Sequence, residues 1–371
     1  MAVVISSQHF GILWIAMEAT TLVTAPLIYF HRHAQSLEAT WKYLLICSVG
    51  IALALMGNMF MAVCTNSESV TLMVPDLCKQ GANINDYALK MAFIFLLVGY
   101  GTKMGLAPFH TWLPDAHSEA PSAVSALLSG TLLNCAFIGV LRGYQVCLSA
   151  GIGDFARNLF LIFGIISVMF AAFFIVGQTD YKRMLAYSSV ENMGIITIGI
   201  GLGGEAVFGS FLHVINHSFT KGLLFLLAGN IYMVYKSKAV KNVSGMIKKM
   251  PLFAILWVAG FLAISGTPPF GMFISKLIII KTMIFNGHYL YASIFLILLA
   301  VIFMGVGRNI LQMTFTSETT AEKDDLIKVP KAYVSKIVAI ILCFIILLIG
   351  VYLPRGLINI LNNAKTMMES F

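Results

Sequence analysis

Several acidic and basic side chains of this sequence lie inside long apolar segments, where a charge is costly. A Lys, Arg or Asp near the centre of a membrane-spanning helix costs about 2.5–3.5 kcal/mol on insertion scales. A protein seldom carries several such groups without a use for them, so they are candidates for holding or moving ions. The candidates are Glu18, Lys103, Glu191, His213, His217, Lys221, Lys276 and Arg308.

Three of these groups follow one another at a spacing of four residues. His213, His217 and Lys221 occupy positions i, i+4 and i+8 of an apolar segment. Each step of four turns a helix by about 400°, so the three drift by only about 40° per step and form one stripe about 12 Å long. A single intramembrane histidine is often a packed, satisfied group. Three titratable groups on one stripe favour a proton relay.

The lysines Lys103 and Lys276 each lie beside a proline that interrupts an apolar segment. Pro108 follows Lys103, and Pro268 and Pro269 precede Lys276. Proline cannot donate to the helix ladder, and broken helices at membrane depth persist only where they are buried in protein or line a wet cavity. We therefore expect broken helices that hold functional lysines, rather than lysines that merely snorkel to the surface.

The elements that position these groups are expected to be membrane-spanning helices. The chain is 59% hydrophobic and only 11% charged, whereas soluble domains carry about 25% charged residues. The sequence therefore predicts an all-α polytopic membrane protein with about ten transmembrane helices. The predicted segments are 8–30, 43–64, 88–108, 121–142, 155–177, 184–204, 206–235, 251–283, 289–315 and 334–354.

An internal repeat is indicated by the spacing of the buried charges. Glu18 and Lys103 are 85 residues apart, as are Glu191 and Lys276. We expect two five-helix units, residues 1–150 and 151–315, followed by a loop and a C-terminal transmembrane helix in 316–371. An odd number of spans inverts the second unit, and inverted repeats with broken helices are typical of ion-translocating folds. The second pair follows the first by 173 residues, and an offset of 174 relates Asn134 to Arg308, which lies at a similar depth in the second unit.

The basic residues of the loops predict the orientation. Alternate loops carry thirteen lysines and arginines against seven on the opposite side, so the first set should be cytoplasmic and both ends of the chain should lie on the outer face. The net charge of +8 is explained by these loops, and no nucleic-acid partner is expected.

No cofactor or metal is expected in this chain. The six cysteines are scattered without a CxxC pair, which argues against zinc, iron–sulfur ligation and disulfide frameworks. A group formed by His110, Asp115, His117 and Glu119 lacks HExxH spacing and is better explained as a loop that leads into a helix near Pro121. The start, MAVVISSQHF, is not a signal peptide.

Four stretches closely resemble the antiporter-like subunits of respiratory complex I and of membrane-bound hydrogenases. They are GTKMGLAPFHTWLPDAHSEAPSAVSALLSG, QTDYKRMLAYSSVENMG, HVINHSFTKGLLFLLAGN and SGTPPFGMFISK. LLNCAFIGVLR and AYSSVENMG look most like the F subunit of hydrogenase-4 and its formate hydrogenlyase relatives. The resemblance implies about fourteen helices that hold two inverted five-helix units. MAVVISSQHF would fall late in the family's fourth helix, so the family's first helices are expected to be absent from this chain.

Carried over residue by residue, the resemblance assigns roles to the buried charges. Glu18 matches the family's glutamate and Lys103 its partner lysine on a broken helix. Lys276 matches the lysine of the second broken helix, and Asn134 stands where many relatives have a lysine or histidine. An amide cannot hold a proton, so a relay step there needs water or another group. The polar axis between the lysines is implied to be His213, His217 and Lys221, with Asn134, Glu191 and Arg308 in support.

The resemblance also implies the partners and the location. Proton transfer would be driven by redox chemistry in neighbouring subunits, with nickel–iron and iron–sulfur centres in those partners and in a peripheral hydrogenase arm. The location would be the cytoplasmic membrane of a prokaryote, among lipid and other membrane subunits. Two alternatives remain open: a sodium/proton antiporter subunit, and a non-conducting membrane anchor for a peripheral hydrogenase. Whether the ion is H⁺ or Na⁺ is not decided by the sequence.

Overall fold

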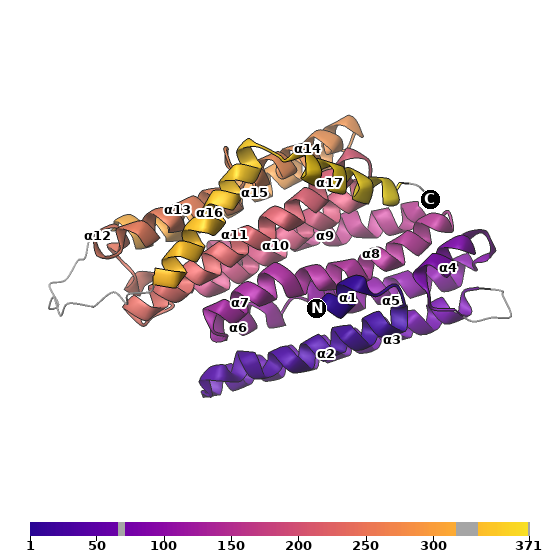
Figure 1. The fold of residues 1–371 in the computed structure, drawn as a ribbon, viewed down its shortest axis with the longest axis horizontal. Helices are drawn as coiled ribbons and strands as arrows, with labels where there is room; N and C mark the ends of the chain where they lie inside the picture. Colours follow the sequence, from indigo (N-terminus) through magenta and orange to yellow (C-terminus); the bar gives the residue numbers. More distant parts are fainter. Residues whose placement is uncertain (66–70, 317–332, 370–371) are drawn as a thin grey trace.

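Long helices run side by side along the longest axis of the molecule (Figure 1). The computed structural model describes residues 1–65, 71–316 and 333–369. Within these ranges eight helical stretches are long and apolar enough to cross a membrane, which makes the chain a multi-pass, all-helical membrane protein. They are α2 with η1 (Phe10–His31), α3 (Ala34–Val63), α7–η3–α8 (Ser122–Ser149), α9 (Gly153–Val176), α10 (Tyr181–Leu202), α11 (Glu205–Tyr235), α15 (Tyr289–Phe315) and α16 (Tyr333–Val351).

Two further expected segments are interrupted. The segment 88–108 matches α5 (Asp86–Met104), which ends at Gly105 and is followed by the short α6 (Trp112–Glu119). The segment 251–283 divides into α13 (Pro251–Ser265) and α14 (Gly271–Phe285), of 15 residues each. The expected loop lysines between residues 317 and 332 lie outside the described residues.

Each break begins at a glycine in the left-handed region of backbone space. Gly105 has φ 85° and Gly266 has φ 78°, a conformation that residues with a Cβ rarely adopt. Neighbouring helices bond to the freed backbone, since Ser167 Oγ accepts from Ala107 N at 2.9 Å and Trp112 Nε1 donates to Thr102 O at 2.8 Å. Irregular backbone at this depth is therefore embedded in protein.

The helices α10 and α11 occupy the middle of the bundle. α10 packs against α9, α11, α6 and α14, and α11 packs against α14, α7, α16 and α13. Small residues allow close approach: a Cβ on Gly194 of α10 would lie 2.8 Å from the carbonyl oxygen of Gly164 in α9. Close backbone contact of this kind is how helices associate in membranes. The two central helices can therefore hold side chains in a protein environment rather than in lipid.

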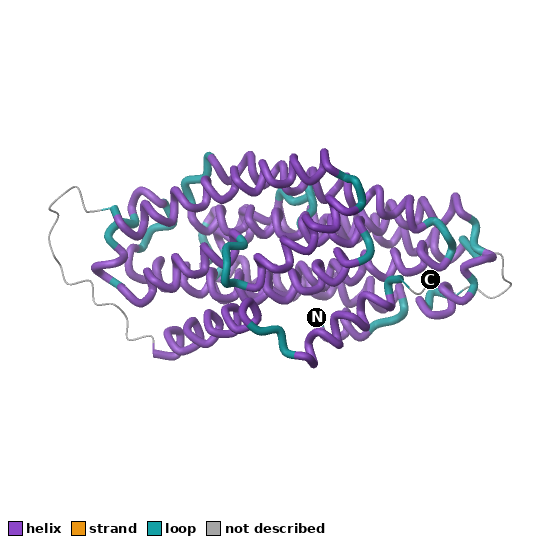
Figure 2. The backbone as a smooth tube through the Cα atoms, turned by 90° about the horizontal axis from the view of Figure 1, so that it is seen from above, coloured by secondary structure: helices purple, strands orange, loops and turns teal. Residues whose placement is uncertain are grey.

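Short helices connect the spans and cover their ends (Figure 2). The C-terminal α17 is fixed to the bundle where Lys365 Nζ donates to Glu205 Oε1 at 2.6 Å, and this hydrogen bond raises the pKa of Lys365. The elements between spans are α4 (Val74–Lys79), η2 (Gly81–Asn83), η4 (Val240–Asn242) and α12 (Met246–Lys249), and the terminal ones are α1 (Ala2–Ser6) and α17 (Arg355–Met367).

Candidate functional site

The second broken helix presents a buried ion pair. Lys276 in α14 donates from Nζ to Glu191 Oε1 of α10 at 3.1 Å, and the two residues are 4% and 2% exposed. The same Nζ lies 3.3 Å from Ile264 O and 3.2 Å from Ser265 O, the last carbonyls of α13. The break in the helix thus supplies oxygen partners to the lysine, because carbonyls at a helix end have no intrahelical donor. Glu191, expected only as a supporting group, is the direct partner of Lys276.

His213 is hydrogen-bonded at both ring nitrogens. Nδ1 lies 2.8 Å from Ser275 Oγ of α14, and Nε2 lies 2.8 Å from Asn192 Oδ1 of α10. The amide of Asn192 donates from Nδ2 to Ser188 O at 2.5 Å, which directs its Oδ1 toward the imidazole. His213 is fully buried. The structure thus places it between two helices that also carry the Lys276–Glu191 pair.

Lys221 of α11 contacts α10 about one turn before Glu191 and Asn192. Its Nζ donates to Leu185 O at 2.5 Å and to Ser188 Oγ. Ser188, Glu191 and Asn192 lie on one face of α10, because residues three and four apart share a face. Ser188 bonds to Lys221, Glu191 to Lys276 and Asn192 to His213. Sequence reasoning missed Ser188 and Asn192, which are uncharged residues in an apolar helix.

His217 lies between these two contacts and has no hydrogen-bond partner among the described residues. Both of its ring nitrogens are buried and unbonded, as is Oδ1 of its neighbour Asn216. Space for the amide of Asn216 comes from Gly271, where a Cβ would lie 2.3 Å from Asn216 Oδ1. His213, His217 and Lys221 are all fully buried on α11, and their role as a relay stays a prediction.

In the first broken helix, Lys103 does not pair with Glu18 directly. Its Nζ donates to Met17 O at 2.6 Å, to Thr20 Oγ1 at 2.8 Å and to Thr21 Oγ1. Thr21 Oγ1 in turn donates to Glu18 Oε2 at 3.3 Å. One hydroxyl therefore bridges the lysine and the carboxylate, and Glu18 also accepts from Ser48 Oγ at 3.1 Å.

Asn134 connects the helices of the first half of the chain to α11. Its Nδ2 donates to Gly130 O and to Ser218 Oγ, each at 2.8 Å, and its buried Oδ1 has no protein partner. The residue follows a π-helical turn, η3 (Leu128–Leu132). Such turns occur frequently at functional sites. Ser218, the partner of Asn134, is the residue that follows His217 in α11.

Arg308 is not brought to these residues. It is exposed on α15 and lines a separate cavity with Lys241. We expected Arg308 as a supporting polar group because it holds the position equivalent to Asn134 in the second unit, but α15 turns its side chain outward.

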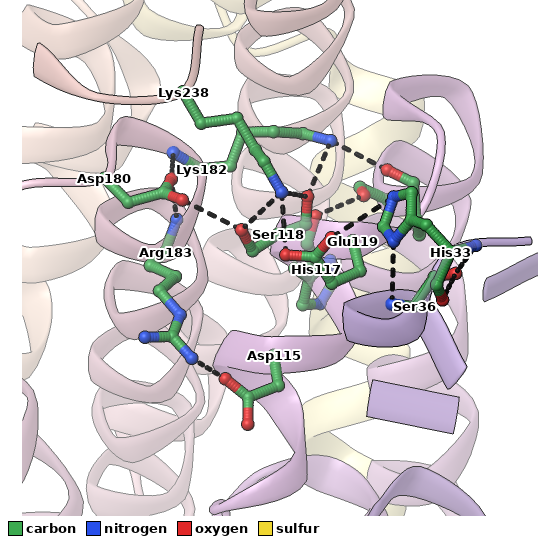
Figure 3. A network of polar contacts seen from close by, with 12 residues as sticks. His33, Ser36, Asp115, His117, Ser118, Glu119, Asp180, Lys182, Arg183 and Lys238 are labelled. Atoms are coloured by element: carbon green, nitrogen blue, oxygen red, sulfur yellow. Dashed lines mark hydrogen bonds and ion pairs between the residues drawn. The ribbon is translucent and has the colours of Figure 1, made fainter. Parts of the chain in front are cut away.

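The polar residues that follow the first broken helix, between Asp115 and Glu119, form part of a polar network at one end of the bundle (Figure 3). Asp115 pairs with Lys42 at 2.9 Å and with Arg183. Glu119 accepts from Lys238 at 2.7 Å and lies 3.7 Å from His33. Ser118 Oγ donates to Asp180 Oδ2 at 2.9 Å, and Lys182 Nζ donates to Ala120 O at 2.7 Å.

His117 of this segment is buried inside the bundle, although we expected it in a loop that leads into a helix. It is fully buried, stacks on Phe225 with ring centroids 5.0 Å apart, and has no partner at either nitrogen. Phe225 lies one turn from Lys221. His117 therefore lies between the network of Figure 3 and the stripe of α11, a placement that its surroundings in the sequence did not indicate.

The family model described as NADH:quinone oxidoreductase/Mrp antiporter, TM matches residues 7–304. The chain therefore belongs to this family of antiporter-like membrane subunits, as its motifs predicted. A hydrogenase-4 component F homolog of Methylacidiphilum infernorum is 39% identical over 288 residues, which cover 76% of this chain and 60% of that protein. F(420)H(2) dehydrogenase subunit N of Methanosarcina mazei is 30% identical over 298 residues, 77% of this chain and 60% of the relative.

Two solved structures share the fold. A chain of the membrane-bound sulfane sulfur reductase, an archaeal respiratory membrane complex, has a TM-score of 0.89 at 24% identity, covering 99% of this chain and 73% of that one. A chain of the Mrp complex from Dietzia sp. has a TM-score of 0.85 at 19% identity, covering 99% and 75%. The chain thus spans about three quarters of these structures and 60% of the curated relatives.

Proposed function

We propose that this chain is a proton-translocating membrane subunit of a redox-driven complex, of the membrane-bound hydrogenase or NADH dehydrogenase type. The observation that carries the proposal is the position of His213, which is hydrogen-bonded at both nitrogens beside the buried Lys276–Glu191 pair. The other support is membership of the NADH:quinone oxidoreductase/Mrp antiporter family.

His213 can gain or lose a proton without changing its partners. When neutral, it donates from Nε2 to Asn192 Oδ1 and accepts at Nδ1 from the hydroxyl of Ser275. When protonated, it donates from both nitrogens, and the Ser275 hydroxyl turns to Met272 O, which lies 2.9 Å from Oγ. Both states are fully hydrogen-bonded, so neither carries the penalty of an unpaired buried group.

Proton transfer between Lys103 and Lys276 would pass Asn134 and then follow the stripe from Lys221 through His217 to His213, which lies beside the Lys276–Glu191 pair. Buried polar groups in proteins are bonded either to protein or to ordered water. The unpaired atoms of Asn134, Asn216 and His217 therefore mark where water would complete the path. An amide such as that of Asn134 cannot hold a proton, so in this proposal it would orient a water molecule that carries the proton past it.

The driving signal would be electrostatic. A nearby carboxylate favours the charged form of a buried lysine, and removing it favours release of the proton. Glu191 touches Lys276 directly, whereas Glu18 acts on Lys103 through Thr21. We infer that the two pairs switch in turn, each changing the field at the other.

The same proposal includes the repeat and the orientation. Residues 1–150 and 151–315 would form two inverted five-helix units within ten spans, with the remaining residues 316–371 outside the repeat. The end of the bundle that carries the network of Figure 3 would face the cytoplasm of a prokaryote, by the positive-inside rule. Nickel–iron and iron–sulfur centres would belong to partner subunits and a peripheral arm.

The test is proton pumping by the assembled complex in inverted membrane vesicles, followed with a pH-sensitive dye during turnover. We expect Lys276→Ala and Glu18→Gln to lower pumping at least tenfold while the complex still assembles. Lys281→Gln, a charge loss on the same helix α14 at an unburied position, should pump normally. Normal pumping by Lys276→Ala would overturn the proposal and favour a membrane anchor, and sodium-dependent flux without redox turnover would favour an antiporter.

A further inference from the structure

A cavity of about 380 Å³ opens between α9, α15 and the turn η4, away from the polar path. Its walls include two cations, Arg308 of α15 and Lys241 of η4, both exposed. The polar side chains of Gln178, Thr179 and Gln312 line the same cavity. The cavity thus combines positive charge with hydrogen-bonding groups in a small volume.

Neither cation is neutralised by the protein that surrounds it. Among the described residues, no ion pair or hydrogen bond involves the side chain of Arg308 or Lys241. This contrasts with Arg183, Lys182 and Lys238 at the same end of the bundle, which are engaged by carboxylates or carbonyl oxygens. Two cations that are unpaired among the described residues thus line one cavity, which leaves a place for an anionic group.

The depth of the cavity corresponds to the boundary between hydrocarbon and headgroups. α15 has 27 residues and is about 40 Å long, whereas a bilayer core is about 30 Å thick. Arg308 lies seven residues before the end of the helix, about 10 Å along its axis. It is therefore about 5 Å inside the hydrocarbon edge, from which an arginine reaches the headgroup level by extending its side chain.

An apolar seam leads from the cavity toward the middle of the membrane. α9 and α15 pack closely here, since a Cβ on Gly305 would lie 3.0 Å from Ile175 Cγ2. Exposed apolar side chains continue the seam at helical spacing on both sides: Phe173 and Met169 on α9, and Met304 and Ile297 on α15. A ligand with one anionic group and long apolar chains would fit both parts.

We propose that this cavity binds the phosphate group of an anionic phospholipid, with Arg308 and Lys241 as its charged contacts and the α9–α15 seam as the surface for its acyl chains. Arginine suits such a ligand because its planar donors match phosphate oxygens. Basic pockets between transmembrane helices are known to select anionic headgroups. A free phosphate would contact the cavity but not the seam. An acidic protein segment would likewise leave the apolar surface uncovered, so a phospholipid is the ligand that fits both parts.

The proposal is tested by native mass spectrometry of the purified complex with added phosphatidylglycerol, phosphatidylcholine or inorganic phosphate. In Arg308→Gln/Lys241→Gln, phosphatidylglycerol should bind about 30-fold more weakly, the effect of two cations at about 1 kcal/mol each. Lys236→Gln/Lys248→Gln removes two exposed charges at the same end of the bundle and should bind the lipid as the unchanged protein does. Phosphatidylcholine binding should be equal in all three.

Three results would overturn the proposal. Equal phosphatidylglycerol binding by both double variants would show that the cavity is not the site. Displacement of the lipid by millimolar inorganic phosphate would identify a free-anion site. Loss of a partner subunit with unchanged lipid binding would identify a protein interface. Lys241→Gln alone changes only an exposed turn and keeps the test valid if the double variant folds poorly, with an expected loss of about fivefold.

Discussion

A buried histidine that takes up and releases a proton needs hydrogen-bond partners in both of its protonation states. His213 meets this requirement through Asn192 and Ser275, each of which offers a partner to either state. His217 meets it in another way, because it has no protein partner and needs water. The two histidines of one stripe thus have different surroundings, although the sequence presents them as equivalent.

The first prediction at this scale concerns Asn192. The substitution Asn192→Ala removes the amide oxygen that is hydrogen-bonded to His213 Nε2. The unpaired nitrogen should destabilise the site by about 1–3 kcal/mol and slow proton pumping at least tenfold, measured by dye quenching in vesicles. Asn230→Ala is the matched control, because Asn230 is a buried amide on α11 that bonds to Leu226 O and Ser335 Oγ instead. Equal pumping by the two variants would contradict a role for Asn192 in transfer.

The charged residues of the site could be predicted from sequence, but their uncharged partners could not. A lysine or glutamate in an apolar segment is conspicuous because of its insertion cost, whereas Ser188 and Asn192 are ordinary residues for a packed helix. Sequence also gives depth along a helix without fixing which side faces the protein. That is why Arg308, expected as a supporting polar group at the position equivalent to Asn134 in the second unit, is found on the exposed side of α15.

At the scale of elements, the two broken helices are what allow a lysine to lie at membrane depth. The prolines indicated both breaks, but the residues that complete them are Gly105 and Gly266, with positive φ. The end of α13 also supplies carbonyl oxygens to Lys276. A continuous helix would have used those carbonyls in its own ladder, so the break and the lysine depend on each other.

Gly266→Ala tests this dependence. An alanine Cβ at Gly266 would lie 2.8 Å from Lys276 Cδ and would also carry the backbone cost of φ 78°, about 1 kcal/mol or more. We expect reduced thermal stability and at least a tenfold loss of pumping. Gly287→Ala separates the two effects, because Gly287 has φ 76° and nothing within 4 Å of the added Cβ. It should lose stability and keep pumping, and an equal loss of pumping in both variants would contradict the argument.

At the scale of the whole molecule, the polar network of Figure 3 joins the first part of the chain to the second. Asp115, Ser118 and Glu119 come from α6, whereas Asp180, Arg183 and Lys238 follow more than 60 residues later. Asp115 is 16% exposed at its side chain and touches two cations. Both cations are 44% exposed, so each pair contributes at most about 1 kcal/mol, the upper end of the range for surface ion pairs.

Asp115→Asn should therefore weaken the association of the two parts of the chain. The change leaves Arg183 without its carboxylate partner, whereas Lys42 keeps Glu38 at 2.6 Å. We expect a loss of about 1 kcal/mol in unfolding free energy in detergent, with limited proteolysis cutting first between residues 119 and 180. Asp154→Asn is the control, because Asp154 is 92% exposed and pairs only with Arg157 three residues away. Its stability should change by less than about 0.5 kcal/mol. If both variants unfold alike, the network does not hold the two parts together, and their packing rests on the apolar contacts of α9, α10 and α11 alone.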